Sequence, residues 1–399
     1  MPAPTFDTVI VRFGGEIGIK APITRKQYEH RLNSNIKASL KHHTIPHSAF
    51  HRKPGRLYIR TSQAKQTADK LSQVFGVSSL SPALETSSSL DEILSISAQL
   101  AESTFKHGES FAARCHRVGN HPYTSQEVCR SVGERLLTAF PQLNLSVDLT
   151  SPKRTLELEI RDEKAYLFTN VIRGVGGLPL GTQPKLVCLL KGDSYSAVAC
   201  WMTMKRGCPP ILLHVNDNMT SLREVESAKQ ITKNLMMWSI GFPTRLRVAR
   251  YNLKPQKLAR EYSSQIASLV RKRLMLRIAQ RIAEMTNSEG IVTGDSLGRS
   301  ATYTASLFRV QDEAVKGLPV YRPLLGLGDD EIASISRGIG LSKAATKKAE
   351  QTQAETKTEL DEIRKIEDEL DSERLIKDAI ESMQTLQLQT STQEAFLNG

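Results

Sequence analysis

The amino-acid sequence predicts an α/β protein with a parallel sheet in its second half. Short apolar runs of the kind that form buried strands, such as 210–215 and 246–251, alternate there with helical spacing over 221–240. A polar turn, KGDS at 191–194, follows an apolar run at 185–190 and opens a further helical pattern. Such a strand–turn–helix unit commonly binds phosphate, because free backbone N–H groups and the helix dipole face the anion. At 399 residues, the chain is expected to form two or three domains of about 100–200 residues each.

The charge of the chain is unevenly distributed. The formal net charge is +12, yet residues 341–399 hold 8 Lys or Arg against 13 Asp or Glu, so the basic excess lies in residues 1–340. That excess suits a polyanionic partner such as nucleic acid, although a basic domain with scattered lysines has the same composition. No apolar run approaches the roughly 18–20 residues of a membrane span, and the first residues lack a signal-peptide layout, so we expect a cytoplasmic protein. The five cysteines form no CxxC pair, which argues against disulfides and a zinc site.

The first domain is expected at 1–62. Residues 7–13 alternate as a strand, 22–41 have apolar residues at helical spacing, and 56–60 form a second predicted strand. The segment between the strands carries basic residues that either contact RNA or form a solvated helix face. These residues are Lys20, Arg25, Lys26 and Arg31.

The second domain is expected at 63–173, with strands at 147–149, 156–161 and 165–173. A basic and polar group lies along a strand end, a proline turn and the next helix. Its members are Arg114, His116, Arg117, His121 and Arg130. Residues of this kind can hold an RNA backbone by its shape and phosphates, whereas lone histidines are more often structural.

The third domain, at 174–340, carries the phosphate turn. A helical region at 259–286 and a strand at 290–294 continue the alternating pattern, which places a ligand at the carboxyl ends of the strands. We expect Cys188 to be a buried strand residue and Cys208 a loop thiol, because a sulfur carrier needs an exposed thiol of low pKa.

The last segment, 341–399, predicts an amphipathic helix with a dense polar face. This helix either pairs with another helix or a second chain, as in a homodimer, or belongs to a loosely held solvated tail.

Several motifs together resemble the tRNA 4-thiouridine synthetase (tRNA sulfurtransferase, ThiI-like) family over about residues 6–340. They are VRFGGEIGIKAPITRKQYEHRL near the N-terminus, FAARCHRVGNHPYTSQEVCRSVGERLL at 111–137, GGLPLGT and WMTMKRG within 176–207, and VTGDSLGR and YRPLLG within 292–326. The resemblance implies a ferredoxin-like N-terminal domain, a THUMP domain that binds the acceptor end of tRNA, and a Rossmann-like PP-loop (adenine nucleotide alpha hydrolase-like) domain. The amphipathic C-terminal helix would follow these three domains.

The resemblance also implies a reaction. ATP, with Mg²⁺, adenylates a uridine carbonyl oxygen in tRNA, and a persulfide sulfur then displaces AMP to give 4-thiouridine. A persulfide donor of the cysteine desulfurase type is the implied partner, and a sulfur-carrier role in thiamine biosynthesis follows from family association alone. The nucleotide contacts that the resemblance carries over are Val187, Cys188, Lys191, Gly192, Ser194, Ser196, His214, Val215, Lys272, Gly294 and Tyr303.

The chain differs from the family at the phosphate loop and at the position of the catalytic cysteine. Against the family loop S-G-G-x-D-S it reads K-G-D-S-Y-S at 191–196, and it has no cysteine after Cys208, where relatives carry a catalytic one. Cluster-binding relatives have a CxxC where this chain has Ser268 and Arg271, so we expect no iron–sulfur cluster. The catalytic residues therefore stay unassigned. Two hypotheses remain: a divergent tRNA sulfurtransferase with a reshaped loop, and a tRNA-binding pseudoenzyme that acts with an active paralogue.

Overall fold

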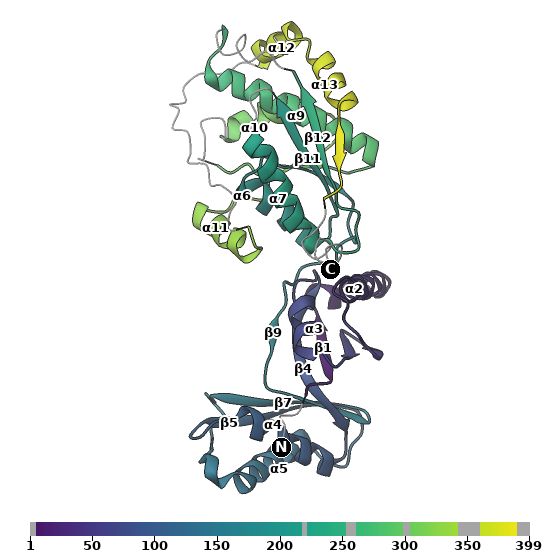
Figure 1. Cartoon of the computed structure of the whole chain (residues 1–399), viewed down its shortest axis with the longest axis vertical. Helices are drawn as coiled ribbons and strands as arrows, with labels where there is room; N and C mark the ends of the chain where they lie inside the picture. Colours follow the sequence, from purple (N-terminus) through teal and green to yellow (C-terminus); the bar gives the residue numbers. More distant parts are fainter. Residues whose placement is uncertain (1–4, 218–221, 253–260, 298–303, 342–359, 389–399) are drawn as a thin grey trace, which may run out of the picture. The chain divides into compact units, whose positions relative to one another are not determined.

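The computed structural model describes residues 5–217, 222–252, 261–297, 304–341 and 360–388. Tyr303 and the segment 342–359 lie outside these described residues. The chain divides into two compact units, Met1–Gly177 and Leu178–Gly399 (Figure 1). None of the described helices has both the length and the apolarity that crossing a membrane requires.

The first unit is built on one sheet of strand order β2-β3-β1-β4-β8-β7-β5-β6, with β9 paired to β4. Its strands are β1 (Thr8–Phe13), β2 (Ala49–Lys53), β3 (Arg56–Arg60), β4 (Val77–Ser87), β5 (Ser110–Val118), β6 (Ser146–Val147), β7 (Arg154–Arg161), β8 (Lys164–Phe168) and β9 (Ile172–Arg173). Its helices are α1 (Gly15–Gly18), α2 (Pro22–His42), α3 (Ala64–Leu71), α4 (Leu90–Thr104) and α5 (Ser125–Ala139), with a 3-10 turn at Pro141–Leu143.

Strand β4 joins two half-sheets. Its first part pairs with β1, where Leu80 lies opposite Val11, and its last part pairs with β8, where Leu84 lies opposite Leu167. Helices α2 and α3 cover the first half-sheet and α4 and α5 cover the second, each pair over its own apolar core. The two half-sheets therefore share one strand, β4.

A buried carboxylate ties the helix-free faces of the two half-sheets together. Glu159 on β7 accepts hydrogen bonds from Arg12 on β1, with Nη2 at 2.6 Å, and lies 3.1 Å from Nε of Arg56 on β3. Burial alone would raise the pKa of Glu159, but the charges of Arg12, Arg56 and Arg161 outweigh it and lower the pKa. The carboxylate thus stays ionised and holds strands that are distant in the sheet order.

Two expected strands of this unit differ from the structure. The strand expected at 147–149 ends at Val147, because the Asp148 side chain accepts the backbone N–H groups of Thr150 and Ser151 and turns the chain. The strand expected at 165–173 is two strands, β8 and β9, which pair with different parts of β4. The strand at 56–60 is confirmed, and the helix expected at 22–41 is α2.

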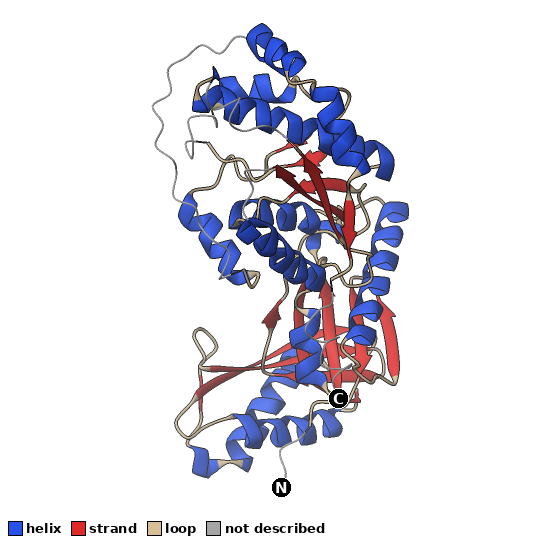
Figure 2. Cartoon of the chain, turned by 45° about the horizontal axis from the view of Figure 1, so that its top comes forward, coloured by secondary structure: helices blue, strands red, loops and turns tan. Residues whose placement is uncertain are grey.

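The second unit contains a six-stranded sheet of order β14-β13-β10-β11-β12-β15, in which only β15 is antiparallel to its neighbour. Its strands are β10 (Leu186–Leu189), β11 (Pro210–Asp217), β12 (Leu246–Tyr251), β13 (Ile291–Val292), β14 (Val320–Tyr321) and β15 (Gln384–Leu386). Its helices are α6 (Ser194–Lys205), α7 (Leu222–Trp238), α9 (Ser264–Thr286), α10 (Ala305–Asp312), α11 (Asp329–Gly338), α12 (Leu360–Glu369) and α13 (Ser372–Glu381). Helices lie on both sides of these strands (Figure 2).

The alternation of side chains along β10 shows how the two faces are covered. Val187 and Leu189 point into the apolar core that includes α9, whereas Cys188 points toward Cys200 of α6. The expected parallel sheet is confirmed, with the strand at 246–251 matched to the residue. The region expected to be helical from 259 has its described helix begin at Ser264, where the Ser263 hydroxyl accepts the Ile266 N–H at 3.3 Å.

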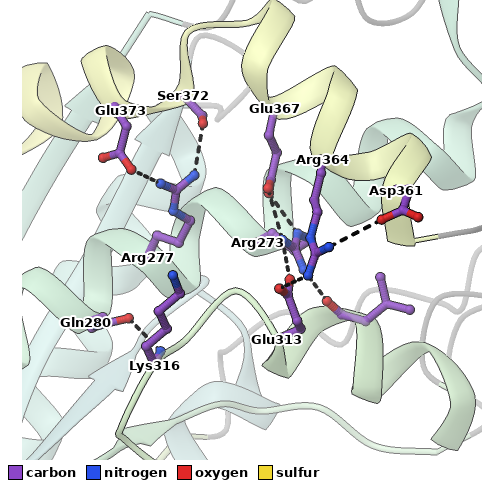
Figure 3. Close-up of polar contacts among 11 residues, drawn as sticks. Arg273, Arg277, Gln280, Glu313, Lys316, Asp361, Arg364, Glu367, Ser372 and Glu373 are labelled. Carbon is purple, nitrogen blue, oxygen red and sulfur yellow. Dashed lines mark hydrogen bonds and ion pairs between the residues drawn. The ribbon is translucent and has the colours of Figure 1, made fainter.

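The C-terminal segment forms two helices where one was expected. The break lies at Asp371, which has a positive φ of 49°. Both helices pack on α9, and β15 pairs with the edge of β12, so the described part of the segment is a paired element and the solvated-tail alternative is wrong for it. Arg273 of α9 lies between Glu367 of α12 and Glu313, with N–O distances of 2.7 and 2.8 Å (Figure 3).

Candidate nucleotide and RNA sites

The turn after β10 lies at the topological switch point of the second sheet. From β10 the chain order runs outward to β11 and β12 on one side, and β13 and β14 lie on the other. The loops that follow β10 and β13 therefore face each other at the carboxyl ends of the strands, where ligands of such sheets bind. Their approach is close: a Cβ on Gly294 would lie 2.4 Å from the backbone nitrogen of Ser196.

Glycine is required at the second position of the turn. Gly192 has a φ of +75°, and a Cβ there would lie 2.6 Å from the carbonyl oxygen of Glu224. Both the left-handed conformation and the space exclude a side chain. The first turn of α6 is thereby held between α7 and the loop after β13.

Asp193 caps helix α6. Its Oδ1 accepts the backbone N–H of Ser196 at 2.9 Å and the Ser196 hydroxyl at 2.7 Å, and the same hydroxyl lies 3.1 Å from the backbone nitrogen of Lys191. The sequence places an aspartate where the family loop has glycine, and the reason is local: the carboxylate accepts the backbone N–H of Ser196, as aspartate does at N-caps.

Tyr195, which stands where the family loop has aspartate, points toward α11. Its hydroxyl donates to Asp329 Oδ1 at 2.6 Å. Ser194 Oγ and His214 Nε2, also at this edge, are buried without a hydrogen-bond partner in the part of the chain that the structure describes. The other ring nitrogen of His214 lies 2.8 Å from the carbonyl oxygen of Leu190, and burial lowers the pKa of this histidine. A neutral imidazole and a hydroxyl are thus left available to a ligand.

A buried ion pair lies at the same edge of the sheet. Lys272 of α9 donates to Asp295 Oδ1 at 2.7 Å, and Asp295 Oδ2 accepts the Thr293 hydroxyl at 2.7 Å and lies 3.4 Å from Arg322 Nε. Burial alone would raise the pKa of Asp295, but the ammonium groups of Lys272 and Lys191 hold it well below its usual range. Burial also lowers the pKa of Lys272 to about 8, although Asp295 opposes this shift.

The structure brings together part of the predicted nucleotide set. Lys191, Gly192, Ser194, Ser196 and Gly294 lie in the turn or against it, with Lys272 and His214 beside them. The side chains of Val187 and Val215 instead belong to the apolar core with α9. Tyr303 lies outside the described residues.

Sequence reasoning missed several polar residues at the same edge: Thr293, Arg322, Asp217 and Arg271. Arg271 donates from Nε to Asp217 Oδ2 at 2.6 Å, at the end of β11. Each of the first three lies at or just beyond the last residue of a parallel strand, which is the signal that could have identified them.

The cysteines of this unit do not have the character of sulfur carriers. Cys188 is buried with 1% exposure, and burial raises the pKa of Cys200 and raises that of Cys208 to about 11. Thiols of this kind are largely protonated at neutral pH and therefore poor nucleophiles.

The residues of this edge do not fit a magnesium ion held by the protein. The position of the family carboxylate is a tyrosine, while Asp295 and Asp217 are each paired with a buried or half-buried cation. Among the described residues there is also no group of three or more His, Cys, Asp or Glu side chains that could hold a metal ion.

The predicted RNA contacts of the second domain are divided between two faces. Arg114 and His116 are exposed on the helix-free face of β5, whereas Arg130 is exposed on α5, which packs on the opposite face. Arg117 and His121 build the turn between them: Arg117 donates to the Gly119 carbonyl at 3.1 Å, and His121 Nε2 lies 2.6 Å from the Asp162 carbonyl.

In the first domain the predicted contacts extend from the end of α1 to the middle of α2. Arg25 pairs with Glu29 one turn later at 2.9 Å, and Lys20 is half-buried after α1. Lys26 and Arg31 are exposed.

Comparisons with known proteins find relatives over most of the chain. Residues 181–372 match the family described as "Thiamine biosynthesis protein (ThiI)", residues 8–81 match the ThiI ferredoxin-like domain, and residues 87–170 match the THUMP domain. A probable tRNA sulfurtransferase of Methanosarcina acetivorans is 34% identical, covering 86% of this chain and 83% of the relative. One of Saccharolobus solfataricus is 34% identical, covering 90% of this chain and 95% of the relative.

Solved structures agree with this assignment. The crystal structure of a 4-thiouridine synthetase–RNA complex with bound ATP matches with a TM-score of 0.81 and 27% identity, covering 96% of this chain and 99% of that one. A protein of Pyrococcus horikoshii matches with a TM-score of 0.67 and 27% identity, covering 84% of this chain and all of that one.

The second unit defines a doubly wound α/β protein with a strand–turn–helix unit at its switch point, joined to ferredoxin-like and THUMP folds. The chain belongs to the tRNA sulfurtransferase (ThiI) family. The family match continues to residue 372, so the expectation that the resemblance ends near Leu341 is wrong and the shared region includes α12.

Proposed function

We propose that this protein is a tRNA sulfurtransferase that uses ATP to form 4-thiouridine in tRNA. The observation that carries the proposal is the packing of Gly294 against Ser196, which aims the first turn of α6 at the switch-point edge. The membership of the family, with a solved relative described as holding RNA and ATP, supports the same conclusion. The cytoplasm, where tRNA is modified, is the compartment that fits this role.

In the proposed reaction the uridine carbonyl oxygen at C4 attacks the α-phosphorus of ATP, and pyrophosphate leaves. Hydrosulfide then attacks C4, and AMP leaves with the former carbonyl oxygen. When a persulfide of a partner protein attacks instead, AMP leaves in the same way and the partner stays joined to C4 through an S–S bond. A thiol must then attack the partner's sulfur, so that 4-thiouridine leaves and the thiol and the partner form a disulfide. With hydrosulfide the remaining S–H proton goes to solvent. The N–H groups of the first turn of α6 and the Lys272 ammonium would hold the phosphates, because both favour negative charge.

The test is thiolation of bulk tRNA by the full chain with ATP and inorganic sulfide. Sulfide supplies the sulfur directly, so the absence of a cysteine after Cys208 does not limit the reaction. We expect ATP-dependent 4-thiouridine, with one AMP released per thiouridine. tRNA binding without thiouridine or AMP would contradict the proposal and identify an RNA-binding pseudoenzyme.

Nucleotide binding should weaken as pH rises through about 8. Lys272 carries its charge below its pKa of about 8 and loses it above, so the attraction for phosphate declines in that direction. We expect the Kd for ATP, measured by calorimetry between pH 7 and pH 9, to rise on the order of tenfold, the effect of losing one cation near phosphate. Lys272→Met should bind weakly with a flat profile; an unchanged Kd in the wild-type protein would contradict the prediction.

tRNA binding should depend on the exposed face of β5. Arg114→Ala is expected to lower the slope of log K against log salt by roughly 0.7–0.9, because one phosphate contact is lost. Filter binding at several salt concentrations measures the slope. Lys377→Ala is the control, since Lys377 is exposed on α13 and pairs only loosely with Glu381 at 3.8 Å. An unchanged slope for Arg114→Ala would exclude this face.

A further inference from the structure

The carboxylates at the switch-point edge are already paired with protein groups. Asp295 holds Lys272 and Thr293, and Asp217 accepts from Arg271. Asp193 accepts twice from Ser196, so its Oδ1 serves as the cap of α6. Magnesium bound with a nucleotide usually takes one or two protein carboxylates in addition to the phosphates. Recruiting one here would break a buried ion pair or uncap a helix, and both changes are costly.

The residue at the family's carboxylate position cannot replace these groups. Tyr195 has 5% exposure, and its hydroxyl donates to Asp329 at 2.6 Å. A neutral phenol that is already donating to a carboxylate is a poor ligand for magnesium, which prefers charged oxygen.

Positive charge, in contrast, is concentrated around the turn. Lys191 occupies its first position, where the family loop has serine, and its backbone N–H donates to the Ser196 hydroxyl at 3.1 Å. Its positive charge also lowers the pKa of Asp295. Lys272 and Arg322 approach the same carboxylate from α9 and from the end of β14. Relative to the family loop, Lys191 adds a positive charge and Tyr195 removes a negative one, while Asp193 adds a negative charge that caps α6.

We propose that this site binds the triphosphate of ATP without a divalent cation held by the protein, and that the Lys191 side chain supplies the positive charge in its place. Lysine is suited to this role because its ammonium is a compact charge on a flexible stem. This inference rests on the proposed nucleotide function, and it concerns how the phosphates are neutralised.

Calorimetry with the full chain tests the proposal, with ATP titrated in excess magnesium and again in EDTA. We expect the Kd to differ by less than about threefold between the two conditions, and Lys191→Ala to raise it in EDTA on the order of tenfold or more. Lys229→Ala is the matched control, since Lys229 lies on α7 and pairs with the exposed Glu226. Thermal melting checks that each variant is folded.

A second pair of variants tests the tyrosine. Tyr195→Asp restores a carboxylate and is expected to make ATP binding tighter in magnesium than in EDTA, whereas Tyr195→Phe, which removes only the hydroxyl bond to Asp329, should stay insensitive to magnesium. Wild-type binding that requires magnesium, or a Lys191→Ala variant that binds normally in EDTA, would overturn the inference and leave the nucleotide function intact. Absence of ATP binding in both conditions would overturn the nucleotide function itself, and the inference with it.

Discussion

Gly294→Ala is expected to reduce ATP affinity on the order of a hundredfold, because each hydrogen bond lost to a charged phosphate is worth about 1.5–3 kcal/mol. The added methyl group would lie 2.4 Å from the backbone nitrogen and 2.6 Å from the Cα of Ser196, and backbone atoms cannot rotate away as a flexible side chain would. The first turn of α6 must therefore shift, and its backbone N–H groups no longer point at the phosphates of the nucleotide. Overpacking of this kind also destabilises by about 1–3 kcal/mol.

Calorimetry with ATP and thermal melting measure the two effects of this substitution. The matched control is Gly326→Ala in the same unit, where a methyl group meets nothing within 4 Å and the backbone needs no positive φ. Its affinity and melting temperature should stay close to those of the wild-type protein. Normal ATP affinity in Gly294→Ala would show that the nucleotide does not use the first turn of α6.

Arg273→Met is expected to destabilise the second unit by about 3–5 kcal/mol, the effect of removing one partner from a buried ion pair. The Arg273 side chain is 3% exposed and that of Glu367 is 7% exposed, so the substitution leaves a buried carboxylate without its cation. The ion pair is bidentate, since Glu367 accepts from Nε and Nη2 of the same guanidinium at 2.7 and 3.0 Å (Figure 3).

Urea unfolding followed by tryptophan fluorescence measures this loss. The chain has two tryptophans, Trp201 on α6 and Trp238 on α7, so the signal reports the second unit alone. Arg277→Met is the control, because Arg277 lies one turn further along α9 and its ion-pair partner, Glu373, has a side chain that is 69% exposed, although Arg277 also donates to the Ser372 hydroxyl at 2.9 Å. Exposed pairs contribute at most about 1 kcal/mol. Equal losses in the two variants would mean that α12 is not anchored through Arg273.

Elements with clear periodicity were predictable from the sequence. The strands at 56–60 and 246–251 are found to the residue because their apolar runs are bounded by polar or turn residues. The break at Asp371 was not predictable, because the apolar spacing continues through it and only its backbone conformation ends the helix.

The residues of the candidate site could be predicted only where they lie close together in the sequence. The turn at 191–194 could be identified because strand, turn and helix are consecutive, and the requirement for glycine at 192 and 294 follows from that geometry. The contacts of Asp295 with Lys272 and Arg322 join residues more than twenty positions apart, and they depend on which strands become neighbours in the sheet. For the same reason the sequence could not show that Arg117 and His121 build a turn, leaving Arg114 and His116 as the exposed pair of that face.

The pairing of β4 with both half-sheets limits which parts of the first unit recombination can exchange. Because β4 pairs with β1 at one end and with β8 at the other, a division before β4 removes the neighbour of β1 from the first half-sheet, and a division after β4 removes the neighbour of β8 from the second. Recombination that exchanges one half alone would expose unpaired strand edges and favour aggregation. We therefore expect the two half-sheets to unfold together in one step.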